Sequence, residues 1–146
     1  MALNELQTIL IVEDSDDDFL ATLRAFKKEN VVNPIQRCSN GDQALDYLYR
    51  RGEFAAPDSA TKPGLMLLDL NLPGTDGRDV LQTVKSDPQF AQMPIIVLTT
   101  SYARDDIEEC YDAGADSYVQ KPVDFAGFVA AIARIKQCWF EVGIAP

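Results

Sequence analysis

The chain alternates between short apolar runs and longer stretches with helical periodicity. Runs of Ile, Val and Leu that are closed by polar residues are typical of strands buried in a parallel sheet. They predict strands at 9–12, 34–38, 65–68, 94–98 and 117–120. Apolar positions three and four residues apart predict helices between these strands, at 15–29, 42–51, 77–86, 104–113 and 124–139. Strict alternation of strands and helices, with right-handed crossovers, predicts a doubly wound parallel α/β sheet.

The first predicted helix carries both apolar and acidic side chains. Ser15 or Asp16 can cap it, and its apolar residues should face the core, namely Phe19, Leu20, Leu23 and Phe26. Its first turn holds Asp16, Asp17 and Asp18, which the helix dipole favours. We expect these three carboxylates to be solvated. A later segment, 52–64, is predicted to be a loop, and we interpret its unusual length as a tolerated surface insertion.

Length, charge and cysteine content limit the classes of protein. The 146 residues fit one domain, with a core at about 8–139 and a tail at 140–146. With 13 basic and 23 acidic residues, the net charge of −10 argues against a nucleic acid or an anionic membrane as partner. The sequence has no apolar run long enough to cross a membrane and no signal peptide. Three scattered cysteines suit a reducing compartment, so we expect a cytoplasmic protein.

Acidic residues stand at the ends of two apolar runs. Glu13 and Asp14 follow the first run, and Asp69 follows the third. The carboxyl ends of parallel strands meet at one edge of the sheet, where open α/β folds bind ligands. Carboxylates gathered at that edge would repel one another, so a cation should lie among them. Because oxygen ligands suit a hard divalent ion, the pattern predicts a Mg²⁺ site.

A hydroxyl and an ammonium group follow two further runs. Thr99 ends the fourth run, and Lys121 with Pro122 ends the fifth. The acid pair, the single Asp, the Thr and the Lys-Pro occur in that order, the last three within LLDLNLPGTDG, VLTTS and YVQKP. This set resembles the receiver domain of bacterial two-component response regulators, from about Thr8 to about Trp139. The resemblance implies a flavodoxin-like receiver fold with strand order 2-1-3-4-5.

The resemblance also implies a part for each acidic site residue. Asp69 would accept a phosphoryl group from a partner histidine kinase. Asp14 would bind Mg²⁺ directly and Glu13 through water, together with Asp69 and the backbone carbonyl of Asn71. The domain would catalyse only its own phosphorylation and dephosphorylation, so it would be no enzyme toward another substrate. Because the chain contains no histidine, it can be only the aspartate side of a phosphorelay.

The remaining site residues would contact the phosphoryl group or report on it. The resemblance implies that Lys121 and Thr99 each bind a phosphoryl oxygen. It also implies a cis Lys121–Pro122 bond, which would direct the lysine inward. Tyr118 resembles the switch aromatic that changes its exposure as Thr99 moves toward the phosphoryl group. An ordinary half-buried strand aromatic is an equally good interpretation of Tyr118.

The C-terminal end and two internal segments bear on output and partners. We expect a stand-alone receiver, because about one turn follows the fifth helix, and it should signal through protein contacts or dimerisation. The TTS and NPIQRCSNGDQALDYL segments resemble response regulators paired with bacterial phytochromes. Trp139 and Phe140, with the fourth and fifth helices and fifth strand, should form a homodimer face. In the competing interpretation Trp139 closes the domain's own core.

Three other functions deserve comparison. A phosphohydrolase with an Asp nucleophile would want a second Asp where Asn71 stands. A nucleotide-binding module would want a Gly-rich loop where residues 13–16 stand. A degenerate receiver that acts as a phosphorylation-independent binding module is the serious rival, although the intact acid pair, Asp, Thr and Lys speak against it.

Overall fold

A single parallel sheet forms the centre of the molecule. The computed structural model describes residues 6–56, 60–100, 103–122 and 124–141. The strands are β1 (Thr8–Val12), β2 (Ile35–Cys38), β3 (Pro63–Leu68), β4 (Ile95–Thr99) and β5 (Ser117–Gln120). They pair in parallel in the order β2-β1-β3-β4-β5. The predicted α/β class and strand order are therefore confirmed.

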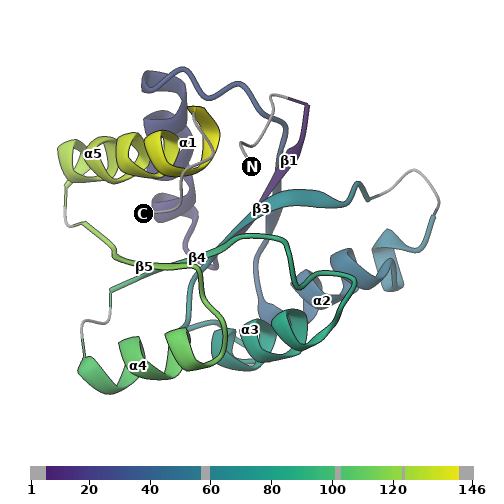
Figure 1. Cartoon of the computed structure of the whole chain (residues 1–146). Coiled ribbons are helices and arrows are strands. Elements are labelled where there is room, and N and C mark those ends of the chain that lie inside the picture. The colour runs from purple at the N-terminus through teal and green to yellow at the C-terminus, as the bar shows by residue number, and fades with distance from the viewer. Residues whose placement is uncertain (1–5, 57–59, 101–102, 123, 142–146) are drawn as a thin grey trace.

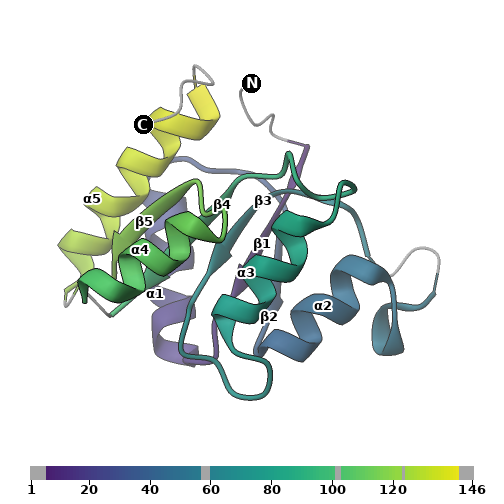
Figure 2. The same cartoon turned by 60° about the horizontal axis from the view of Figure 1, so that its bottom comes forward.

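Helices cover both faces of the sheet (Figure 1). They are α1 (Asp16–Lys28), α2 (Gly41–Tyr49), α3 (Gly77–Ser86), α4 (Arg104–Asp112) and α5 (Phe125–Lys136). Helices α1 and α5 lie on one face, while α2, α3 and α4 lie side by side on the other (Figure 2). The predicted bounds of α3 are confirmed. The fifth helix is shorter than predicted, because its last turn widens into a π-helical segment, Gln137–Glu141.

The sheet separates two apolar cores. Alternate residues of a strand point to opposite faces, so Ile9 and Ile11 of β1 pack toward α1 and α5, whereas Leu10 and Val12 pack toward α2 and α3. All of these side chains are buried. Because both faces are covered, the three central strands β1, β3 and β4 are buried along almost their whole length. The edge strands β2 and β5 are only partly buried and carry polar residues such as Gln36 and Gln120.

Helix α1 buries a narrower stripe than its sequence predicts. Its buried side chains are Thr22, Ala25 and Phe26, whereas Leu20 is 46% exposed, so the inward assignment of Leu20 was wrong. Thr22 takes a core position because its hydroxyl donates to the Asp18 carbonyl at 2.8 Å. That bond satisfies the polar atom and leaves the methyl group free to pack.

The segment expected as a loop after α2 is partly ordered by aromatic contacts. A 3₁₀ turn, Gly52–Phe54, buries Phe54 against the Tyr47 ring, with centroids 5.0 Å apart. The Tyr47 hydroxyl donates to the Thr61 carbonyl at 2.7 Å and accepts from the Thr61 N–H at 3.1 Å. Strand β3 then begins at Pro63, before the predicted end of the loop. The two described ends of this connection are therefore tied to α2.

The C-terminal turn packs on the domain itself. Trp139 is partly buried against the apolar core between the sheet and helices α1 and α5. This packing agrees with the competing interpretation, in which Trp139 closes the core. The Phe140 side chain lies outside the described part of the structure. None of the helices described here is long and apolar enough to cross a membrane.

Candidate functional site

Three carboxylates gather where β1 and β3 end. Glu13 and Asp14 follow β1, and Asp69 follows β3; one oxygen atom from each lies within 4.8 Å of the others. Glu13 and Asp69 are buried, while Asp14 is exposed. The two strands are neighbours in the sheet, with Val12 opposite Leu68. The site therefore follows directly from strand order, as predicted.

The ammonium group of Lys121 reaches into this cluster from the end of β5. Its Nζ atom lies 2.6 Å from Glu13 Oε1, 3.0 Å from Asp69 Oδ2 and 2.8 Å from Asp18 Oδ2. The lysine side chain is only 5% exposed. The cis Lys121–Pro122 bond implied by the family resemblance was wrong, since the described residues contain no cis peptide bond. The trans bond is the ordinary preference of an X–Pro unit, and the three carboxylates suffice to hold the lysine inward.

Burial and pairing shift the ionisation of this group of side chains. Burial raises the pKa of the Glu13 carboxyl to about 7, although Lys121 opposes the shift. Burial alone would lower the pKa of the Lys121 ammonium, but hydrogen bonds with Asp18, Glu13 and Asp69 outweigh it and raise that pKa. Lys121 therefore keeps a fixed positive charge in the site.

Thr99 ends β4, the strand that pairs with β3 in the sheet. The residue is fully buried, and its Oγ1 atom has no hydrogen-bond partner within the described structure. A buried hydroxyl without a partner is costly and rare. In a binding site, such a hydroxyl can donate a hydrogen bond to an oxygen atom of the ligand. The backbone of Thr99 is fixed, because its carbonyl accepts a 2.6 Å hydrogen bond from the Lys121 N–H.

The loop between β3 and α3 is packed tightly against the site. The Asn71 N–H donates to Asp69 Oδ1 at 3.2 Å, which orients the carboxylate. Gly77 must be glycine, since a Cβ atom there would lie 2.3 Å from the Asp69 carbonyl oxygen. At Gly41, the first residue of α2, a Cβ atom would lie 2.0 Å from the Thr75 carbonyl oxygen. The loop is thus held between two helix starts.

The sequence did not predict the contact between Asp18 and Lys121. The first turn of α1 was expected to be solvated, and the Asp16 side chain is indeed 84% exposed, although it pairs with Arg37 at 2.7 Å. Asp18, by contrast, pairs with the buried ammonium group of Lys121. Only the short spacing between the acid pair and the helix start could have suggested the Asp18 contact. That spacing places the first turn of α1 beside the carboxyl edge of the sheet.

Tyr118 lies on β5 opposite Val97 of β4. Its side chain is partly buried and packs toward the core beneath α2, α3 and α4. Its N–H donates to the hydroxyl of Tyr111 on α4 at 3.1 Å. The residue therefore joins β5 to α4, and a switch role for it stays a prediction.

The cluster has the chemistry of a cation site. Carboxylate and carbonyl oxygens are ligands of hard divalent ions, and Glu13, Asp14 and Asp69 supply only oxygens. The donor set therefore fits a divalent metal. Lys121 balances part of the negative charge of the same carboxylates.

Known proteins resemble this chain over almost its full length. Residues 9–133 match the response regulator receiver domain family. The Synechocystis response regulator Rcp1 is 32% identical, over 98% of this chain and 95% of Rcp1. The Mn²⁺-bound structure of Rcp1 superimposes with a TM-score of 0.86 at 31% identity, covering 96% of this chain and 99% of that one.

Two further solved structures are similarly close. The response regulator RPA3017 in red light signalling of R. palustris is 35% identical, with a TM-score of 0.87, over 97% of this chain and 99% of that one. The phosphorylated cyanobacterial phytochrome response regulator RcpA is 34% identical, with a TM-score of 0.84, over 92% and 94%. Together with the assembled acid pair, Asp69, Thr99 and Lys121, these matches identify the chain as a two-component response regulator of the receiver domain family.

Proposed function

We propose that Asp69 accepts a phosphoryl group from a partner histidine kinase. The observation that carries this proposal is the setting of its buried carboxylate. One oxygen accepts from the Asn71 N–H, and the other contacts the Lys121 ammonium beside the acid pair. A degenerate receiver is not favoured, because Thr99 and the other members of the set are present and assembled.

The phosphoryl transfer that we propose needs no other nucleophile. An Asp69 oxygen attacks phosphorus, and the bond from phosphorus to the donor breaks, with its electron pair leaving on the donor. With acetyl phosphate as donor, acetate leaves and an aspartyl phosphate forms. The protein thus promotes its own phosphorylation, and water later attacks the same phosphorus to release phosphate.

Mg²⁺ is the ion that we propose for the acidic cluster. Asp14, Asp69 and the Asn71 carbonyl would hold it, with Glu13 acting through water. When bound, the ion neutralises negative charge on the phosphoryl oxygens. Support for a divalent ion comes from the all-oxygen donor set and from the Mn²⁺-bound structure of the similar protein Rcp1. The preference for Mg²⁺ rests on the oxygen donors and the few protein ligands.

Lys121 and Thr99 would bind the phosphoryl oxygens directly. The ammonium supplies a charge-assisted donor, and the buried Thr99 hydroxyl supplies a donor that has no partner in the described structure. Movement of Thr99 toward the phosphoryl group would be felt by Tyr118, which lies on the neighbouring strand. We propose Thr99 and Tyr118 as the switch.

The partner kinase that we propose is a bacterial phytochrome. Support comes from RcpA, described as a phytochrome response regulator, and from RPA3017, described in red light signalling. The similarity to both spans more than nine tenths of the chain.

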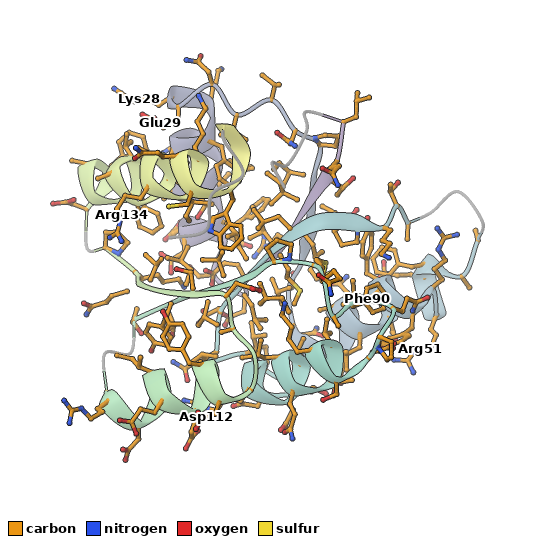
Figure 3. The ribbon with its side chains drawn as sticks, viewed as in Figure 1. Lys28, Glu29, Arg51, Phe90, Asp112 and Arg134 are labelled. Carbon is orange, nitrogen blue, oxygen red and sulfur yellow. The ribbon has the colours of Figure 1, made fainter. Side chains whose placement is uncertain are left out.

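We also propose a homodimer that uses the α4–β5–α5 face, completed by Trp139 and Phe140. A groove of about 540 Å³ lies on this face, and its lining includes Ile107, Tyr111, Tyr118 and Arg134. Arg134 points from the side of α5 that faces β5 (Figure 3). The groove offers both apolar and charged surface to a second copy.

Intact mass spectrometry after incubation with Mg²⁺ and acetyl phosphate tests the proposed phosphoacceptor. Wild type should gain one phosphoryl group that is stable in acid and labile in base. Asp69→Asn should keep the fold and gain none, while the exposed control Asp79→Asn should behave as wild type. A phosphoryl group with the same lability on Asp69→Asn would contradict the assignment.

A further inference from the structure

The Lys121 ammonium group is fully occupied by carboxylates. It carries three N–H donors, and it lies within 3.0 Å of oxygens from Glu13, Asp18 and Asp69. Glu13 and Asp69 belong to the cluster described above. Asp18 comes from the first turn of α1 and takes no part in the proposed metal site.

Asp69 loses its carboxylate charge when it is phosphorylated, so one phosphoryl oxygen can take over its lysine donor. A second phosphoryl oxygen can bind Lys121 only when Glu13 or Asp18 releases a donor. Glu13 is ill suited to release its donor, because its side chain is only 5% exposed. Asp18 is 36% exposed and also lines an open hollow of about 380 Å³ between α1 and α5. Its carboxylate can therefore turn to water at little cost, whereas a buried carboxylate left without a partner would be strongly destabilised.

The backbone of Asp18 is fixed, so the exchange concerns its side chain alone. The Asp18 N–H donates to the capping Ser15 hydroxyl at 3.2 Å, and its carbonyl accepts from Thr22 at 2.8 Å. The positive end of the helix also favours the carboxylate at this position. These bonds hold the Asp18 backbone at the rim of the site, and none of them involves the phosphoryl group.

We propose that Asp18 is a positioning residue that holds Lys121 in the unphosphorylated protein and competes with the phosphoryl group for it. The inference rests on the proposed phosphorylation of Asp69. On phosphorylation, one lysine N–H passes from Asp18 to a phosphoryl oxygen, and no covalent bond of Asp18 changes. Asp18 also adds negative charge beside an incoming dianion. Both effects lower the affinity of the site for the phosphoryl group and shorten the lifetime of the phosphorylated state.

Beryllofluoride, a phosphoryl mimic, tests the competition at saturating Mg²⁺, with its affinity measured by titration calorimetry on the full chain. Asp18→Asn should bind it about two- to fivefold more tightly than wild type, as expected for the loss of one partly exposed ion pair. The matched control Asp17→Asn removes the same charge from an exposed neighbour and should stay within about twofold. The aspartyl phosphate of Asp18→Asn should also decay more slowly than that of Asp17→Asn.

An Asp18 that merely supports Lys121 would give the opposite result. In that case Asp18→Asn would bind beryllofluoride more weakly than Asp17→Asn, or equally well, and the inference would be overturned. Asp18→Ser serves as a second neutral variant should thermal melting show that Asp18→Asn is unfolded. A wild type that gains no phosphoryl group from acetyl phosphate would overturn the proposed function together with the inference. A wild type that is phosphorylated while the two variants behave alike would overturn the inference alone.

Discussion

The backbone N–H of Lys121 donates a 2.6 Å hydrogen bond to the carbonyl of Thr99. This bond links β4 and β5 at the residues that we expect to bind the phosphoryl group. Any shift of Thr99 toward a ligand must therefore either carry the β5 end with it or lengthen this bond. We therefore expect any coupling between the site and the proposed switch to begin at this backbone bond.

Removal of divalent metal should stop phosphorylation. Without a cation, Glu13, Asp14 and Asp69 repel the incoming phosphoryl oxygens, and Lys121 alone offsets only part of their charge. Excess EDTA should slow phosphorylation by acetyl phosphate about 100-fold or more, measured by intact mass. Restoration by added Mg²⁺ is the control. Undiminished transfer in EDTA would refute the metal requirement.

Lys121→Ala should keep metal binding but uncouple phosphorylation from the switch. The variant leaves Glu13 and Asp69 buried without their cation, so the metal-free protein should lose about 3 kcal/mol of stability. Added Mg²⁺ should recover part of this loss, which thermal melting would detect. Lys27→Ala, on the exposed surface of α1, is the control. Lost metal binding together with normal switching would show that the lysine has another role.

Arg78→Met should loosen α4. The Arg78 guanidinium at the start of α3 contacts Asp106 at 2.5 Å and Glu109 at 3.4 Å on α4. Among α4 residues only Cys110 is buried, so these ion pairs should contribute substantially to holding α4 against α3. The variant should lose about 1 kcal/mol, with faster hydrogen exchange in 104–112. Arg24→Met, on α1, should leave that exchange unchanged, and equal protection in both variants would argue against this contribution.

The proposed dimer is tested by sedimentation velocity of wild type and of the Trp139→Ala, Phe140→Ala double variant. Wild type should associate at high concentration and the double variant should not. Because Trp139 also packs on its own core, the variant should lose about 2 kcal/mol of stability as well. A wild type that stays monomeric, free and phosphorylated, while the variant melts lower, would leave Trp139 with a role in the core alone.

The sequence predicted those parts of the molecule that strand order determines. Glu13, Asp69 and Thr99 each follow an apolar run, and a parallel sheet places the ends of all such runs on one edge. The bounds of α3 were also predictable, because Val80, Leu81 and Val84 repeat with helical spacing and are all buried. These features depend on local pattern and on topology, both of which are written into the chain.

Features that depend on how the helices and strands pack against one another were not predictable. The contact of Asp18 with Lys121 joins residues far apart in the chain, and it depends on the tilt of α1 against the sheet. The exposure of Leu20 depends on how much of the surface of α1 is covered by α5. The isomer of the Lys121–Pro122 bond is likewise decided by the surrounding contacts rather than by the dipeptide.

The fit between Gly41 and the Thr75 carbonyl has a consequence for the direction of signalling. The loop after Asp69 rests on the start of α2, where no side chain can be inserted, and Thr75 also hydrogen-bonds to Asp42. One wall of the site is thereby immobilised. We therefore expect a phosphoryl group on Asp69 to shift mainly the other side of the site, where β4 ends at Thr99. We expect variants that loosen the contact between Gly41 and the Thr75 carbonyl to weaken the conformational response to phosphorylation. In such variants the movement would be divided between two sides of the site.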